Sequence, residues 1–128
     1  QRVGQDIFRQ SLIGYWQGRC AVSGLDVVPL LRASHIKPWA DCANDGERLD
    51  VFNGLLLAPH LDALFDGGWI GFADDGELLV SHCLPGPARV LLGLRGERRR
   101  VALTDGHRRY LAWRREKVFR AQFAARGG

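Results

Sequence analysis

The chain has 128 residues, of which 46% are hydrophobic and 25% charged, a composition typical of one globular domain. No apolar run approaches the roughly 20 residues that cross a bilayer, and the first ten residues lack the apolar core of a signal peptide. These features exclude a membrane-spanning protein and predict a soluble domain over residues 1–128 with no membrane partner. Because the chain contains no methionine, even at position 1, we expect it to be part of a longer protein.

The cysteines and the arginines narrow the class of protein further. Cys20, Cys42 and Cys83 are odd in number and form no C-x-x-C pair, which argues against a disulfide framework and a cysteine-based zinc site. We therefore expect a reducing, cytoplasmic location. The net charge is +4, with many arginines between Arg95 and Arg126, and arginine suits phosphate recognition. The alternative for this stretch is a solvated helix face.

The N-terminal part of the sequence predicts a helix, two strands and a loop. Apolar residues at helical spacing predict the helix over 3–17. Short apolar runs predict strands over 20–25 and 27–36, although Pro29 disfavours a regular central strand where it stands. Residues 37–50 are rich in Asp, Asn, Gly and Pro, which is typical of a loop.

The rest of the chain continues the alternation of short strands and helices. In chain order we expect a buried strand, a short helix, a hairpin around a DDG turn, two strands and a last helix capped by Thr104 or Asp105, at 54–59, 60–68, 69–81, 88–94, 98–103 and from 105 onward. We find no internal repeat or linker. The order predicts a small α+β domain.

Four residues that could share a site lie at the ends of consecutive predicted elements: His35, Asn53, His60 and Asp62. Two strands followed by a helix would bring these ends into one cleft. A neutral imidazole can take a proton from water near pH 7, and a metal held by His or Asp can stabilise charge on a scissile phosphate. A buried amide can hold the loop that orients the imidazole. These residue types therefore suit hydrolysis of a phosphodiester.

Three stretches carry a family resemblance: CAVSG, RASHIKPW and ERLDVFNGLLLAPHLDALFDGG. Together they resemble the HNH endonucleases, in particular the subgroup found in restriction-type nucleases. The resemblance covers a core of about residues 19–75 and, more weakly, YLAWRREKVF near the C-terminus. It implies a ββα-metal core, to which the helices and the hairpin predicted above would be additions. It also implies a DNA endonuclease that uses a divalent ion, Mg²⁺ or Mn²⁺, and leaves open a homodimer and a recognition domain N-terminal to this chain.

The resemblance also implies roles for the four residues. His35 is the expected general base that activates water, and Asn53 orients the catalytic loop. Asp62 is the expected metal ligand, since carboxylate oxygen suits Mg²⁺. His60 is the expected second ligand or a phosphate contact. The alternatives are a core histidine for His35, a turn residue for Asn53 and a helix cap or surface position for His60.

One position departs from the family pattern. Many HNH enzymes carry Asp, Glu or His just before the general base as a metal ligand, and this chain has Ser34. The missing ligand would have to come from water, from backbone, or from Asp50 or Asp66. The alternative for Asp66 is a structural role in its helix.

DNA contacts are expected from the last helix, where Arg108, Arg109, Arg114 and Arg115 form the set that faces phosphates. Two other functions stay open. The first is a non-catalytic nucleic-acid-binding module whose HNH site is degenerate because of Ser34. The second is an interaction domain that uses a Trp-rich surface.

Overall fold

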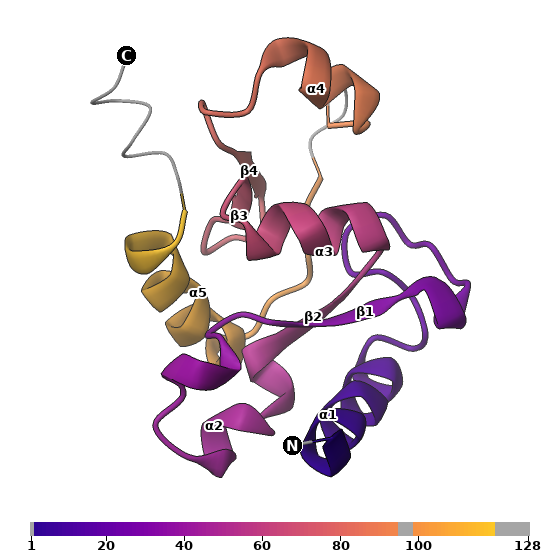
Figure 1. Cartoon of the computed structure of the whole chain (residues 1–128), viewed down its shortest axis with the longest axis vertical. Helices are drawn as coiled ribbons and strands as arrows, with labels where there is room; N and C mark the ends of the chain where they lie inside the picture. The colour runs from indigo at the N-terminus through magenta and orange to yellow at the C-terminus, as the bar shows by residue number, and fades with distance from the viewer. Residues whose placement is uncertain (1, 95–98, 120–128) are drawn as a thin grey trace.

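A hairpin of two antiparallel strands lies at the centre of the molecule (Figure 1). The computed structural model describes residues 2–94 and 99–119. Strand β1 (Arg32–His35) pairs with strand β2 (Gly54–Leu57), in a register that places His35 opposite Gly54. All four residues of β2 are buried, which explains why this strand is a continuous apolar run rather than an alternating one.

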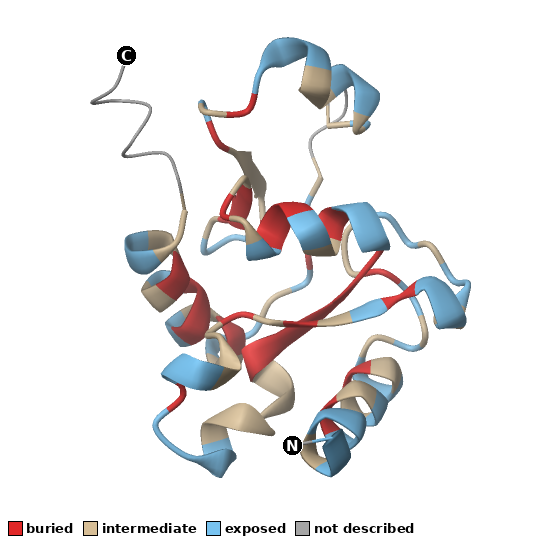
Figure 2. Cartoon of the chain, in the orientation of Figure 1, coloured by how far each residue is buried: buried red, intermediate tan, exposed pale blue. Residues whose placement is uncertain are grey.

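Helix α3 (Pro59–Asp66) begins after a single connecting residue and packs against β1. Pro59 stands in its first turn, where the fixed φ of proline suits a helix start and its missing N–H leaves no bond unmade. Leu61, Leu64 and Phe65 bury one face of the helix. Figure 2 shows this buried face continuing into β2, so the two strands and the helix share one core. The expected ββα unit is therefore present.

Two longer helices flank this unit, at opposite sides of the view in Figure 1. Helix α1 (Arg2–Tyr15) packs on β1 and β2 and buries Phe8 and Leu12. Helix α5 (Asp105–Lys117) begins with a capping box in which Thr104 and His107 each accept from the other's backbone N–H. Both helices confirm the flanking helices expected from the sequence.

A second antiparallel pair, β3 (Ile70–Phe72) and β4 (Leu78–Val80), forms the expected added hairpin. Its turn requires glycine at position 76, where φ is +88° and a Cβ would lie 2.0 Å from the carbonyl oxygen of Val101. With two small antiparallel sheets and helices around them, the fold is α+β, as predicted. Within residues 2–94 and 99–119, no helix is long and apolar enough to cross a membrane.

Short helical segments complete the fold: η1 (Val28–Leu30), η2 (Trp39–Asp41), α2 (Asp45–Arg48), η3 (Val51–Asn53) and α4 (Gly86–Leu91). Of the strand predicted over 27–36, only the β1 part forms, because the stretch around Pro29 takes up a 3-10 turn. The predicted loop over 37–50 contains two of the short helices, the second capped by the Asn44 side chain, which accepts from the Glu47 N–H at 2.9 Å.

Two predicted strands are wrong. Residues 20–25 form a turn instead, closed by the N–H of Cys20 on the Leu25 carbonyl at 2.8 Å, with Gly24 at φ +77°. Residues 88–94 belong largely to α4 and the turn after it, because a short apolar run does not distinguish a strand from a helix and Pro87 stands in the first turn of α4. For the strand predicted over 98–103, Arg98 lies outside the described residues, and Arg100 forms an isolated bridge with Glu77.

Candidate active site

His35 lies at the end of β1 and is half-buried. Its Nε2 lies 2.8 Å from the carbonyl oxygen of Arg48. Because a carbonyl only accepts, Nε2 carries the proton and Nδ1 keeps the lone pair. Burial lowers the pKa of His35, with the hydrogen bond to Arg48 acting in the opposite direction. The neutral imidazole that results can accept a proton through Nδ1 at neutral pH.

Asn53 is fully buried and holds the segment between Lys37 and Glu47. Arg48, whose carbonyl bonds to His35, directly follows this segment. Its Oδ1 accepts from the N–H of Lys37 at 2.7 Å. Its Nδ2 donates to the carbonyl oxygens of Lys37 at 3.2 Å and Glu47 at 3.0 Å. The amide therefore ties the start of the loop after β1 to helix α2. Because Glu47 directly precedes Arg48 in α2, Asn53 is placed to fix the carbonyl that orients His35.

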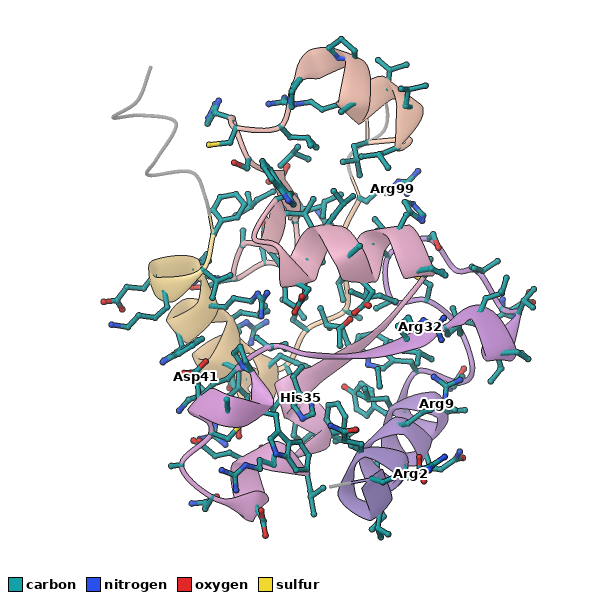
Figure 3. All side chains as sticks on the ribbon, in the orientation of Figure 1. Arg2, Arg9, Arg32, His35, Asp41 and Arg99 are labelled. Carbon is teal, nitrogen blue, oxygen red and sulfur yellow. The ribbon has the colours of Figure 1, made fainter. Side chains whose placement is uncertain are left out.

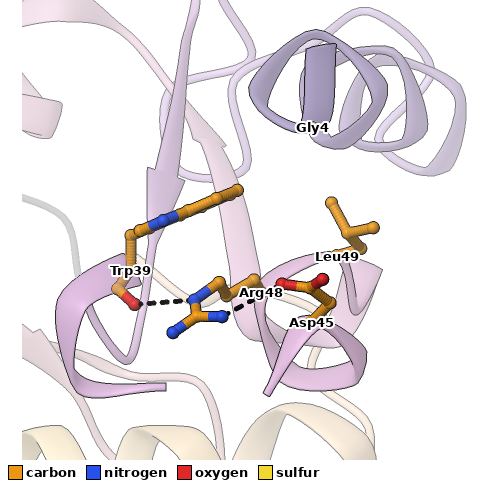
Figure 4. Close-up of a pocket in the computed structure, with 5 residues that line it drawn as sticks. All are labelled: Gly4, Trp39, Asp45, Arg48 and Leu49. Atoms are coloured by element: carbon orange, nitrogen blue, oxygen red, sulfur yellow. Dashed lines mark hydrogen bonds and ion pairs between the residues drawn. The ribbon is translucent and has the colours of Figure 1, made fainter. Parts of the chain in front are cut away.

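The Arg48 side chain adds a second restraint on the same carbonyl. Its Nε donates to the Trp39 carbonyl at 3.2 Å, and a guanidinium nitrogen lies 3.0 Å from the Asp45 carboxylate (Figure 4). The guanidinium also lies 5.7 Å from the centre of the Trp39 ring, a cation–π distance. Gly4 of α1 closes the far side of the hollow around this indole. Contacts with Trp39 and Asp45 therefore hold Arg48, whose carbonyl oxygen bonds to His35.

A hollow of about 340 Å³ lies where the end of β1 meets α3. Four of the residues that line it can bind a metal, form hydrogen bonds or accept a proton: Ser34, His35, Asp62 and Asp66. The other lining residues are Ala33, Pro38, Trp39 and Phe65. The two carboxylates stand four residues apart on α3, which places them on one face of the helix. The Ser34 hydroxyl donates a hydrogen bond to the Asp62 carboxylate. The structure therefore brings a histidine, a hydroxyl and two carboxylates together.

Two residues considered from the sequence lie elsewhere. His60 is exposed and does not line the hollow, because it precedes Asp62 by two residues, about 200° around a helix. When Asp62 faces β1, His60 faces away from it. Asp50 caps η3 and accepts from the Tyr110 hydroxyl at 2.8 Å. The structure thus does not bring His60 to the carboxylates, and of the two candidate extra ligands it places Asp66, rather than Asp50, at the hollow.

The donor set of the hollow fits a hard divalent cation that keeps part of its water. In the described part of the chain, no group of three or more His, Cys, Asp or Glu side chains is arranged to hold a metal. Mg²⁺ is commonly bound by one or two carboxylates, with water and substrate phosphate completing the octahedron. Asp62 and Asp66 supply such carboxylates. The site does not offer the closed set of nitrogen and sulfur ligands typical of structural zinc.

Arg114 was expected to face phosphate, but the structure places it in the interior. Its side chain is buried, and its guanidinium donates to the carbonyl oxygens of Ile36 at 2.6 Å and Phe65 at 2.5 Å, with longer bonds to those of His35 and Asp66. Burial lowers its pKa to about 10, with Asp66 and Asp62 acting in the opposite direction. Arg114 therefore ties the end of β1 to the end of α3, directly behind the site.

The other three arginines of α5 are engaged with acidic residues and carbonyls of this chain. Arg115 donates to Asp74 at 2.8 Å and to the Phe72 carbonyl. Arg108 and Arg109 pair with Asp105 at 2.6 Å and with Asp50 at 3.2 Å respectively. These pairs reduce what α5 can offer to DNA, although the Arg109 side chain stays 62% exposed.

Sequence reasoning missed Phe8, Arg9 and Arg48 as parts of the site. Phe8 stacks on the His35 ring, and its only signal in the sequence is a position on the apolar face of a helix. Arg48 acts through its carbonyl oxygen, which every residue possesses, so no pattern could single it out. Arg9 lines a second hollow beside His35 and belongs to a helix outside the family resemblance.

The strand pair, the helix and the hollow between them form a ββα unit with polar residues gathered at one place. Residues 20–73 match the family model of the HNH endonucleases. The fold resembles a modification-dependent TagI restriction endonuclease, with a TM-score of 0.56 and 22% sequence identity over 85% of this chain and 36% of the other. No curated protein matches the chain. Residues 20–73 thus match the HNH endonuclease family, as the sequence resemblance predicted, and the chain spans little more than a third of that TagI enzyme.

Proposed function

We propose that this domain is a metal-dependent DNA endonuclease of restriction type. The observation that carries the proposal is the neutral His35 imidazole, whose Nδ1 keeps its lone pair, in a hollow shared with Asp62 and Asp66. His35 Nδ1 accepts a proton from a water molecule as the water oxygen bonds to phosphorus. The bond from phosphorus to the 3′ oxygen breaks, and this oxygen takes a proton from solvent.

In this proposal Asp62 and Asp66 hold a divalent ion, Mg²⁺ or Mn²⁺. When bound, the ion stabilises negative charge on the phosphate and on the leaving oxygen. Ser34 does not add a carboxylate, but its hydroxyl donates to Asp62 and so fixes the orientation of that ligand. Asn53 and Arg48 keep His35 in its tautomer. The three cysteines form no disulfide with one another, which supports a cytoplasmic location.

A non-catalytic DNA-binding module is the second candidate. The observation that favours it is Ser34 in a position where many relatives have a metal ligand, so that the hollow holds two carboxylates rather than three. With a weaker metal site, the same surface would bind DNA without cutting it. The two candidates differ in whether a divalent ion changes the DNA itself or leaves it intact.

The test is nicking of a supercoiled plasmid in Mg²⁺, in Mn²⁺ and in EDTA. We expect nicking with either metal and none in EDTA, and we expect His35→Ala and Asp62→Ala to abolish it. His60→Ala is the matched control, because it removes an exposed imidazole two residues from Asp62 and should leave nicking unchanged. DNA binding without nicking in either metal would favour the binding module, and full activity of His35→Ala would contradict the proposed base.

A further inference from the structure

A second hollow, of about 370 Å³, lies between α1 and β1. It is lined by Gln5, Asp6, Phe8, Arg9, Ala33 and His35. Ala33 and His35 also line the hollow that contains the carboxylates, so the two spaces meet at the proposed base. A DNA strand whose scissile phosphate lies at His35 would therefore find the carboxylates on one side and the residues of α1 on the other.

Arg9 is a fixed positive charge at this second hollow. Its guanidinium donates to the Leu31 carbonyl at 2.6 Å and to the Val28 carbonyl at 3.1 Å. These bonds use two of the five N–H donors of an arginine and do not neutralise its charge. Because the side chain is already held, little conformational freedom would be lost when the remaining donors meet an anion.

Further arginines lie on the same flank of the molecule. In the view of Figure 3, Arg32, Arg9 and Arg2 are labelled one below another to the right of His35, at the start of β1 and along α1. Arg32 is exposed, directly follows the Leu31 carbonyl that Arg9 holds, and has no side-chain partner among the described residues. Of the residues that line the hollow, only Asp6 is acidic, and it too has no partner in the described ranges.

We propose that the hollow between α1 and β1 is a phosphate subsite for DNA. It receives the phosphate next to the scissile one on the strand being cut, with Arg9 as its fixed donor, and the exposed Arg32 contacts the same DNA strand outside the hollow. The inference rests on the proposed function, since it places the cut strand across His35. It also moves the expected phosphate contacts from α5, whose arginines are paired within the chain, to α1 and β1.

The test measures the salt dependence of binding to a short DNA duplex in EDTA, where nothing is cut. Each phosphate contact contributes a slope of about 0.9 to the fall of log K with log salt concentration. We expect Arg32→Gln to weaken binding and to reduce this slope by about 1. Arg19→Gln is the matched control, because Arg19 is an exposed arginine that pairs with Asp26 and lines neither hollow.

A variant that is expected to bind DNA more tightly makes the test more specific. Asp6→Asn removes the one carboxylate of the subsite and should tighten DNA binding, whereas Asp26→Asn, an exposed carboxylate elsewhere, should not. Arg9→Lys keeps the charge but loses the planar fork, so we expect weaker binding with most of the salt slope retained. Arg32 and Asp6 decide the outcome, since neither has a side-chain bond in the described structure whose loss could disturb the fold.

The outcomes separate this inference from the proposed function. If Arg32→Gln and Asp6→Asn bind DNA with the slope and affinity of the parent protein, the subsite is wrong, even when the plasmid is nicked as proposed. If both variants shift binding in the expected directions but no metal supports nicking, the subsite stands and the proposed hydrolysis fails. Shifts as large in Arg19→Gln and Asp26→Asn would overturn the assignment to α1 and β1.

Discussion

The imidazole of His35 stacks on the ring of Phe8, with the ring centres 3.8 Å apart and the planes 11° apart. Phe8 belongs to α1, which lies outside the residues that match the HNH family. The Phe8 ring also packs tightly against Gly54, which lies opposite His35 in the hairpin. A Cβ at this glycine would lie 2.4 Å from the Phe8 ring. Helix α1 therefore completes the environment of the proposed base.

The stacking contact predicts that Phe8 helps to lower the pKa of His35. Burial lowers the pKa of His35, so Phe8→Leu, which replaces the ring by a smaller side chain, should raise this pKa toward 6.5. A general base works deprotonated, so the acid limb of the pH–rate profile should move to higher pH. The control is Phe72→Leu, a fully buried phenylalanine that does not line either hollow beside His35. We expect it to lower stability, by about 1 kcal/mol, without moving the profile.

Asn53 should matter strongly for stability. Asn53→Ala removes one acceptor and one amide group that serve Lys37 and Glu47 in a fully buried position, which should cost about 2–4 kcal/mol of unfolding free energy. Asn44→Ala is a useful comparison, since Asn44 caps α2 from an exposed position and its loss should cost about 1 kcal/mol. Denaturant unfolding measures both, and equal losses would contradict the role given to Asn53.

Loss of Arg114 should cost far more stability than loss of an exposed arginine. Arg114→Met keeps the apolar stem but leaves the carbonyls of Ile36 and Phe65 without a donor in the interior, a loss of about 3 kcal/mol or more. Arg100→Gln removes an exposed pair with Asp75 and should cost less than about 1 kcal/mol. Thermal and denaturant unfolding would show the contrast. A small effect of Arg114→Met would mean that water replaces the guanidinium.

The parts of the fold that the sequence predicts are those with local signals. The apolar run of β2 followed by Pro59, the DDG turn before Glu77 and the capping residue Thr104 each act within a few residues, and each marks an element that forms. The short run at 20–25 lacks such a signal, since a few apolar residues suit a turn, a strand or a helix equally well. The run at 88–94 does follow one, because Pro87 stands in the first turn of α4 as Pro59 does in α3, so this helix could have been predicted.

The candidate site could be predicted only in part, for a related reason. The helical period already separates His60 from Asp62, so the sequence could have settled which of the two faces β1. Arg114 is different, because its partners are main-chain carbonyls 78 and 49 residues away. Carbonyl oxygens carry no side-chain signature, so its buried role could come only from the structure.

His107 should make the protein less stable in acid. It is fully buried, its Nδ1 accepts from the Thr104 N–H at 3.1 Å, and burial lowers its pKa below 6.5. The unfolded chain therefore binds a proton that the folded protein resists, so the unfolding free energy should fall as the pH drops below about 6.5. His107→Gln keeps a capping side chain without this titration and should flatten part of that slope. His35, whose pKa is also lowered by burial, contributes another part, and an unchanged slope in His107→Gln would contradict the prediction.

The position of Ser34 next to Asp62 predicts that a carboxylate there would raise the metal affinity. Its hydroxyl donates to Asp62, so Ser34→Asp would place a third carboxylate beside Asp62 and Asp66. Without metal, the three like charges should lower the melting temperature. With Mg²⁺ or Mn²⁺, the variant should gain more than the parent, because a ligand at 100 times its Kd stabilises a fold by about 2.7 kcal/mol. Thermal unfolding across a metal titration measures the difference.

Two comparisons make this last prediction specific. Ser23→Asp adds the same charge at an exposed position away from the hollow and should show no added response to metal. Ser34→Ala removes the donor that orients Asp62, so its response should fall below that of the parent protein. If Ser34→Asp gains no more from metal than Ser23→Asp does, the ion does not bind between β1 and α3, and the ligand roles of Asp62 and Asp66 would have to be abandoned.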